Sequence, residues 1–147
     1  MPKKKYDVGF TCSAFDLCHA GHVLMLKDAK EQCDHLIVGL QDDPSVTDAS
    51  YRGKKKNVPI MSLEERRIIL EGIRYIDEII VYNTEEDLYK LLKKLKPDVR
   101  ILGTDWKGKR YTGYDLPIEI YYHNRNHNYS TSGLRERIAK AEAEKDQ

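Results

Sequence analysis

The chain has 147 residues, of which 40% are hydrophobic and 33% are charged, and its formal net charge is +1. This length suits a single domain that buries its own core, and the balance of apolar and charged residues argues against a disordered chain. The near-neutral charge provides no overall field that would attract nucleic acid, so we expect no nucleic-acid partner.

No apolar run approaches the roughly 20 residues that a membrane span needs, and the N-terminus lacks the apolar stretch of a secretory signal. The three cysteines, Cys12, Cys18 and Cys33, form no even set and no CxxC pair, which predicts reduced thiols. We therefore expect a cytoplasmic protein with no membrane partner.

Strand and helix patterns alternate along the chain. A β-prone run at residues 6–11 precedes a helical pattern that extends to about residue 32, and an apolar strand is expected at 35–40. Residues 42–61 are polar and show no periodicity, which predicts a surface loop. A capping-box sequence that begins at Ser62 predicts a second helix up to residue 75. The remaining expected elements are a strand at 78–82, a helix around 88–95, strands at 99–102 and 118–122, and a helix from residue 130 that fades into a charged tail.

Strands that alternate with helices across short loops predict an α/β fold, a Rossmann-like, doubly wound parallel sheet of five strands. We expect one domain over residues 1–147, with flexible ends at 1–5 and about 140–147. In such sheets, ligands bind at the carboxyl ends of the strands, near the point where the strand order reverses. The polar segments expected at these ends are residues 12–22, 41–61, 103–113 and 123–129.

His19 and His22 lie three residues apart at the start of the first predicted helix, where the helix dipole is positive. Free backbone N–H groups bind anions there, and Gly21 leaves space for a phosphate to approach. Nucleotidyl transfer depends on positioning and on donors that meet growing negative charge, and imidazole N–H groups are such donors. The plain alternative is that both are ordinary polar residues at a helix start. A zinc site from Cys18, His19 and His22 lacks a fourth ligand at the usual spacing, so we expect no metal ligands among the side chains.

The segment FDLCHAGH at residues 15–22 resembles the HxGH signature of the cytidylyltransferase family, in which the glycerol-3-phosphate cytidylyltransferases are the most similar members. The likeness covers nearly the whole chain. Because several motifs follow one another in the family's order, the resemblance is far more specific than an isolated HxGH. The further matching segments are residues 61–66, 74–77, 103–109 and 125–131.

The resemblance implies a transferase that moves CMP from CTP to a phosphorylated small alcohol, such as glycerol 3-phosphate or a related polyol phosphate, with Mg²⁺ bound to the triphosphate. One alternative is an ATP-dependent adenylyltransferase of the same fold, since base choice depends on a few loop contacts. Another is a nucleotide-binding sensor or subunit without turnover, because Ser13, Ala14 and Asn126 depart from the family's pattern.

The resemblance also assigns roles to individual residues. The expected catalytic residues are His19, His22, Lys55 and Arg125, with Lys54 and Lys56 as alternatives to Lys55. The expected nucleotide-binding residues are Ser13, Ala14, Phe15, Gly21, Gly103, Asp105, Ser130 and Thr131. The acceptor is expected to contact Asp16, Lys55 and Trp106, and the interface of a homodimer is expected to contain Arg66, Arg74, Tyr75 and Asp77. The ordinary alternatives are a solvated run of lysines, a Ser/Thr helix cap and a surface turn.

Overall fold

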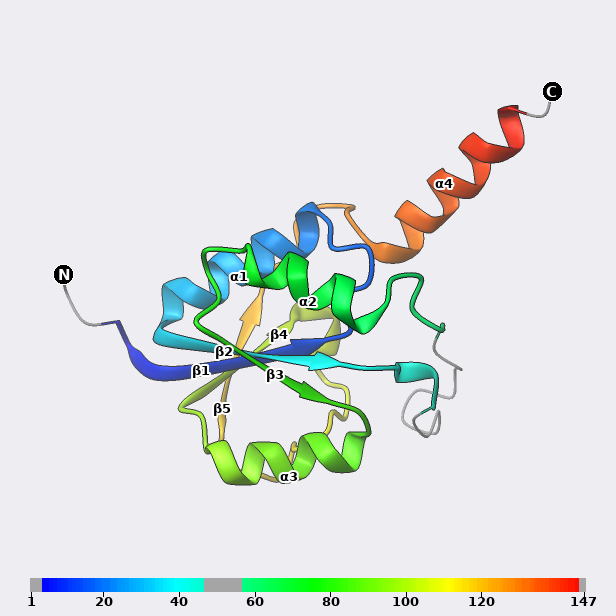
Figure 1. Ribbon diagram of the computed structural model, residues 1–147. Helices are drawn as coiled ribbons and strands as arrows, with labels where there is room; N and C mark the ends of the chain where they lie inside the picture. The colour runs from blue at the N-terminus through cyan, green and yellow to red at the C-terminus, as the bar shows by residue number, and fades with distance from the viewer. Residues whose placement is uncertain (1–3, 47–56, 146–147) are drawn as a thin grey trace.

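The computed structural model describes residues 4–46 and 57–145 (Figure 1). In this part of the chain, five strands form one parallel sheet in the order β3-β2-β1-β4-β5. The strands are β1 (Tyr6–Ser13), β2 (Cys33–Gln41), β3 (Glu78–Tyr82), β4 (Val99–Gly103) and β5 (Glu119–His123). The helices are α1 (Ala20–Gln32), α2 (Leu63–Glu71), α3 (Glu85–Leu95) and α4 (Thr131–Lys145), and short 3-10 turns lie at η1 (Pro44–Val46) and η3 (Thr104–Trp106). The predicted Rossmann-like fold is confirmed.

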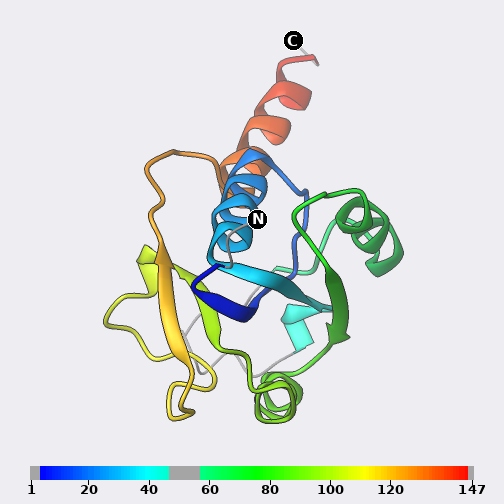
Figure 2. The ribbon, with the colours of Figure 1, turned by 90° about the vertical axis from the view of Figure 1, so that its left-hand side faces the viewer.

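Helices cover both faces of the sheet. α1 and α2 lie on one face and α3 lies on the other, as Figures 1 and 2 show from two directions. α4 extends away from the sheet, and none of its residues, all of which are described, is buried (Figure 1). No described helix combines the length and the apolar character that crossing a membrane requires.

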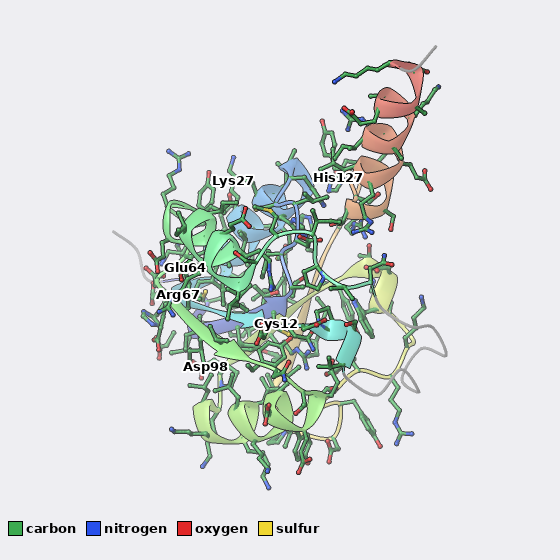
Figure 3. All side chains as sticks on the ribbon, turned by 45° about the vertical axis from the view of Figure 1, so that its right-hand side comes forward. Cys12, Lys27, Glu64, Arg67, Asp98 and His127 are labelled. Carbon is green, nitrogen blue, oxygen red and sulfur yellow. The ribbon has the colours of Figure 1, made fainter. Side chains whose placement is uncertain are left out.

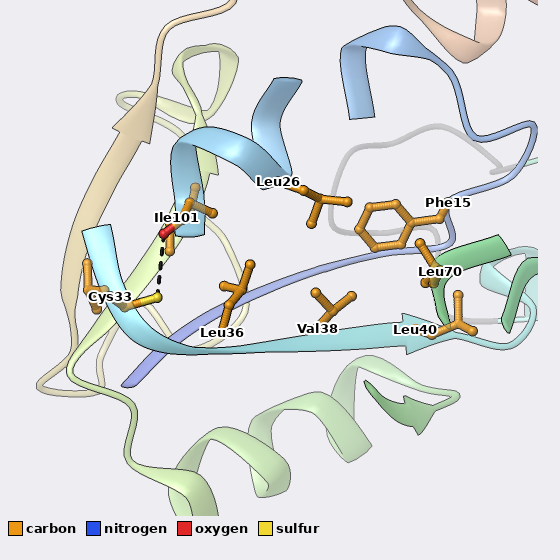
Figure 4. Packing of buried hydrophobic residues seen from close by; sticks show 10 residues of the cluster. Phe15, Leu26, Cys33, Leu36, Val38, Leu40, Leu70 and Ile101 are labelled. Carbon is orange, nitrogen blue, oxygen red and sulfur yellow. Dashed lines mark hydrogen bonds between the residues drawn. The ribbon is translucent and has the colours of Figure 1, made fainter. Parts of the chain in front are cut away.

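The core has two parts because neighbouring residues of a strand point to opposite faces of the sheet. Leu36, Val38 and Leu40 of β2 pack with residues of α1 and α2 on one face (Figure 4). Ile37 of the same strand packs with Leu88 and other residues on the face that α3 covers. β2 is thus buried on both sides, as its continuous apolar sequence predicts.

Two helix ends differ from the sequence-based expectation. α2 ends at Glu71 instead of residue 75, because the backbone N–H of Gly72 turns back to the carbonyls of Ile69 and Leu70. Ile73 and Ile76, the apolar residues after this turn, pack against the core instead of continuing the helix. At the other end of the chain, α4 is helical to Lys145, beyond the point near residue 140 where a tail was expected.

The strand order reverses between β1 and β4. From β1 the chain adds β2 and β3 on one side, and it then returns to place β4 and β5 on the other side. Loops after β1 and β4 therefore leave in different directions, which opens a crevice at their carboxyl ends. Ser13 ends β1 and Gly103 ends β4, so both lie at this crevice.

Candidate active site

A pocket of about 270 Å³ lies at the carboxyl ends of β1, β4 and β5, beside the start of α1. It brings together three of the four polar segments that were expected at the ligand-binding edge. Its lining contains these residues expected from the sequence: Ser13, His19, Gly21, His22, Gly103, Asp105, Trp106, Arg125, Ser130 and Thr131. It also contains five residues that were not expected: Met25, His123, His127, Tyr129 and Ser132.

His19 and His22 form a reciprocal cap at the start of α1. The Nδ1 of His19 accepts a hydrogen bond from the backbone N–H of Gly21 at 3.0 Å, and the Nδ1 of His22 accepts one from the backbone N–H of His19 at 3.3 Å. The two rings stack with their centroids 3.9 Å apart. Because both Nδ1 atoms act as acceptors, we assign the ring proton of each neutral imidazole to Nε2. The pair therefore retains two Nε2–H donors.

Both imidazoles are held in the neutral form. Burial, together with the nearby His19 and Arg125, lowers the pKa of His22 to about 3, although Asp16 opposes this shift. Burial, Arg125 and His127 also lower the pKa of His19 below its usual value. At neutral pH the two rings therefore donate hydrogen bonds without carrying a positive charge.

The loop between β1 and α1 packs against His22 from the side of the hydrophobic core. Phe15 is 1% exposed and belongs to the core (Figure 4). Its ring centroid lies 5.2 Å from that of His22. Phe15 and Leu17 adopt the left-handed φ values of 52° and 50°, which non-glycine residues rarely adopt. The side chain of Phe15 thus supports His22 and does not line the pocket, and the nucleotide contact expected of this residue stays a prediction. Ala14 does not line the pocket either, and its carbonyl oxygen accepts from Arg66 at 3.0 Å.

Arg66 lies inside the molecule and not at a surface that a second subunit would contact. Its residue is 2% exposed, and its guanidinium donates to the carbonyl oxygens of Ala14, Gln41 and Asp42 at 3.0, 2.6 and 2.5 Å. Its Nε also donates to the carbonyl oxygens of Met61 and Ser62. Arg66 therefore joins the loop after β1, the end of β2 and the start of α2, which corrects its expected place at a dimer interface.

The other three residues expected at that interface lie nearer the surface. Arg74 is exposed, and its guanidinium donates to the hydroxyl of Tyr75 at 2.9 Å. The carboxylate of Asp77 accepts from Lys30 Nζ at 2.6 Å and from the backbone N–H of Leu36 at 2.8 Å. Asp77 thus already stabilises the monomer, whereas Arg74 has room to contact a partner. The homodimer itself stays a prediction.

Asp16 is buried, and its carboxylate is already engaged. It accepts from the backbone N–H groups of Ile60 and Met61 at 2.9 and 3.0 Å, and Arg135 lies 3.9 Å away. The backbone carbonyl of Asp16 also accepts from the hydroxyl of Thr131 at 3.4 Å. Asp16 therefore ties the loop after β1 to the approach to α2 and to the start of α4. Lys55, its expected companion at the acceptor, and the alternatives Lys54 and Lys56 lie outside the described residues.

The part of the pocket rim beside η3 and the start of α4 contains Arg125, Asp105 and Ser130. Arg125 donates to the backbone carbonyl of Tyr129 at 3.0 Å, and its guanidinium lies 3.9 Å from the carboxylate of Asp105. Ser130 Oγ accepts from the N–H of Gly133 at 2.9 Å at the start of α4, which is the ordinary helix-cap role. The hydroxyl proton of Ser130 and the backbone N–H groups at the start of α4 are further hydrogen-bond donors at this part of the rim.

Two histidines that sequence reasoning did not single out complete the pocket. His123 is 7% exposed at the end of β5, and its Nδ1 lies 2.7 Å from the carboxylate of Asp28. His127 lies in the segment that leads from β5 to α4 (Figure 3). A Cβ atom built on Gly21 would come within 3.0 Å of its ring, so the glycine allows this close approach. The sequence signals were the place of both histidines in the polar segment 123–129 and the place of His127 in the matching segment 125–131, and neither signal identifies the residues that the histidines contact.

Comparisons with known proteins agree with this geometry. A family model described as Cytidylyltransferase-like matches residues 10–137. The chain is 38% identical over 139 residues to the Bifunctional protein HldE of Campylobacter concisus, covering 95% of this chain and 28% of that protein. It is 42% identical over 111 residues to the Bifunctional protein HldE of Wolinella succinogenes, covering 76% and 22% respectively. The chain thus spans less than a third of the length of these curated relatives.

One solved structure with a similar fold is the lipopolysaccharide core biosynthesis protein from Thermoplasma volcanium. It superposes with a TM-score of 0.61 at 25% sequence identity, and the match covers 85% of this chain and 99% of that one.

Proposed function

Because the chain belongs to the cytidylyltransferase-like family of nucleotidyltransferases, we propose that it transfers AMP from ATP to a sugar phosphate and releases pyrophosphate. The similarity to HldE proteins supports this choice, since their domain of this family adenylylates a heptose 1-phosphate with ATP. The similarity to a lipopolysaccharide core biosynthesis protein also favours a sugar as the acceptor. The similar relatives named above are HldE proteins, whereas the motifs suggested glycerol-3-phosphate cytidylyltransferases as the most similar members, and this difference favours the adenylyltransferase alternative.

The stacked pair of neutral imidazoles at the start of α1 is the observation that carries the proposal. In the proposed reaction, an oxygen of the acceptor phosphate attacks the α-phosphorus in line, and the bond to the β-phosphate breaks. The Nε2–H groups of His19 and His22 would donate to the oxygens on which negative charge grows. Fixed donors in a partly buried site stabilise such charge more strongly than water does, because they need no reorientation.

The part of the pocket rim that contains Arg125 and the start of α4 suits the leaving pyrophosphate. Arg125 presents a guanidinium fork that matches phosphate oxygens, and Ser130 and Thr131 present hydroxyls at the start of α4. We propose that these groups hold the β- and γ-phosphates. Ser13 lines the same pocket, whereas Ala14 does not, and the Ser13 side chain offers a hydroxyl there.

Mg²⁺ would enter with the triphosphate. Among the residues described, no group of three or more His, Cys, Asp or Glu side chains is arranged to hold a metal. Asp105 contributes a carboxylate to the pocket wall. Since Mg²⁺ retains several waters and binds phosphate oxygens readily, one protein carboxylate suits such an ion. Bound there, Mg²⁺ would supply charge neutralisation for the departing pyrophosphate.

Lys55 keeps its proposed role as the cation that brings the acceptor phosphate to the α-phosphorus. The contacts of Asp16 support this role. Asp16, in the loop between β1 and α1, accepts hydrogen bonds from the backbone N–H groups of Ile60 and Met61, which follow Lys55 by five and six positions in the sequence. Turnover of the Lys55→Ala, Lys54→Ala and Lys56→Ala variants, compared under the same conditions, would identify which lysine of the run acts.

Pyrophosphate release by the purified chain with Mg²⁺ tests the proposal. ATP and CTP, with UTP and GTP alongside, would each be combined with a heptose 1-phosphate, other sugar 1-phosphates and glycerol 3-phosphate. We expect release with ATP and a sugar 1-phosphate, and release that is slower by about a hundredfold or more from the His22→Ala variant. Release only with CTP and glycerol 3-phosphate would overturn the choice of substrates, and nucleotide binding without release from any pair would favour a sensor or subunit without turnover.

A further inference from the structure

His123 lines the pocket and belongs to a partly buried polar cluster. Its Nδ1 lies 2.7 Å from Oδ2 of Asp28, and the hydroxyl of Tyr121 donates to Oδ1 of the same carboxylate at 3.0 Å. The side-chain amide of Gln32 also donates to Oδ1, at 3.2 Å. Nε2 of His123 is buried and has no hydrogen-bond partner among the described residues. A buried polar atom without a partner is costly, which indicates that a ligand completes this one.

The hydrogen bonds of Asp28 determine the chemical character of that free atom. The carboxylate only accepts hydrogen bonds, so Nδ1 of His123 carries a proton, and in the neutral form of the ring Nε2 is then an acceptor. His19 and His22 have the reverse arrangement, because their Nδ1 atoms accept from the backbone and their Nε2 atoms donate. The pocket therefore combines imidazole donors at the start of α1 with an imidazole acceptor at the end of β5.

The carboxylate that holds His123 lies further along α1 than the helix start, where the phosphates are proposed to bind. Gly21, Met25 and Asp28 follow one face of α1 at intervals of four and three residues, so this face runs from the helix start to the carboxylate that holds His123. Met25 and Trp106, which line the pocket with His123, provide a thioether and an aromatic ring, surfaces suited to a flat base. A neutral acceptor repels phosphate oxygens, which are themselves acceptors, and it requires a ligand N–H or O–H.

We propose that Nε2 of His123 accepts a hydrogen bond from the exocyclic amino group of the nucleotide base. This inference rests on the proposed function, and it assigns a nucleotide-specificity role to His123 with Asp28 as its positioning residue. Adenine and cytosine carry an amino group at the relevant ring position, whereas hypoxanthine and uracil carry a carbonyl oxygen. His123 would therefore favour ATP over ITP, and CTP over UTP, whichever of the two amino bases the enzyme uses.

Binding of ATP and ITP to the whole chain, measured by calorimetry without acceptor, tests this role. We expect ATP to bind roughly tenfold more tightly than ITP in the unaltered chain and the two to bind about equally in His123→Phe, which keeps a ring of similar size but no acceptor. If His123→Phe fails to fold, His123→Gln serves instead, since its amide can turn to offer either a donor or an acceptor.

Asp28→Asn gives a second and sharper test. Gln32 donates to Oδ1 of Asp28, and the hydroxyl of Tyr121 lies nearer Oδ1, at 3.0 Å, than Oδ2, at 3.3 Å. We therefore expect the oxygen of an asparagine to stay at the Oδ1 site and its NH₂ group to face Nδ1 of His123. The ring proton would then move to Nε2, as a wrong tautomer forms when the aspartate behind a catalytic histidine is replaced by asparagine. We expect the preference for ATP over ITP to vanish or reverse. Glu78→Gln is the matched control, because it alters the exposed His35–Glu78 pair and should leave the preference unchanged.

The outcomes separate this inference from the proposed function. An unchanged ATP to ITP ratio in both His123→Phe and Asp28→Asn would overturn the role of His123 even if pyrophosphate release were normal. A variant that changes only the ratio of ATP to 2′-deoxy-ATP would show a ribose contact, and that too would overturn the base contact. Failure of any nucleoside triphosphate to bind the unaltered chain would contradict the proposed function as well.

Discussion

The backbone N–H of His19 donates to the Nδ1 of His22 at 3.3 Å, so each imidazole of the pair is oriented by the first turn of α1. This backbone contact leaves both Nε2–H groups for the substrate. Replacing either histidine by alanine should lower turnover by about a hundredfold or more, because a fixed donor to the transition state is lost. Pyrophosphate release and circular dichroism, measured together, check that the fold survives. Near-normal turnover in either variant would remove the catalytic assignment.

The pKa of His22 predicts a pH effect on stability. Its folded value of about 3 lies below the usual value of 6.5, so between these limits the unfolded chain binds a proton that the folded chain does not. The free energy of unfolding should therefore fall as the pH drops from about 6.5 towards 3, by an amount on the order of a few kcal/mol. Urea unfolding at several pH values, with His22→Gln as the comparison, measures this slope. A variant that is as pH-sensitive as the unaltered chain would contradict the prediction.

Arg66 should matter for stability more than any exposed arginine of α2. Arg66→Ala would leave the buried carbonyls of Ala14 and Gln41 without their charged donor, and we expect a loss of roughly 3 kcal/mol in the free energy of unfolding. The neighbouring Arg67 is exposed and pairs with the exposed Glu71, so Arg67→Ala should cost less than about 1 kcal/mol. Urea denaturation of both variants tests the difference, and equal losses would show that the buried contacts contribute little.

The homodimer predicted from the segment 74–77 is also open to test. Arg74 is exposed beside Tyr75, so Arg74→Glu should weaken a subunit contact there by reversing the charge without disturbing the core. Sedimentation at micromolar concentration should show a dimer for the unaltered chain and a shift to monomer for the variant. A monomeric unaltered chain would eliminate the dimer.

Many features of this protein follow from local sequence patterns. The strand-helix alternation, the capping box at Ser62 and the HxGH segment at residues 19–22 each depend on residues close together in the chain, so their structural meaning is accessible without tertiary information. The order of the strands in a right-handed α/β sheet then places the polar loops at one edge, which is why most of the expected site residues share one pocket.

Only the tertiary structure decided which side chains face that pocket and which support it. Phe15 and Arg66 belong to matching motifs, yet both are buried because packing between distant segments surrounds them. Asp28 and His123 are 95 positions apart, and their contact arises because α1 packs beside β5. The sequence by itself determined which chemical groups are present and which elements carry them. Their partners, their burial and the proton positions on their rings depend on residues brought together only by folding.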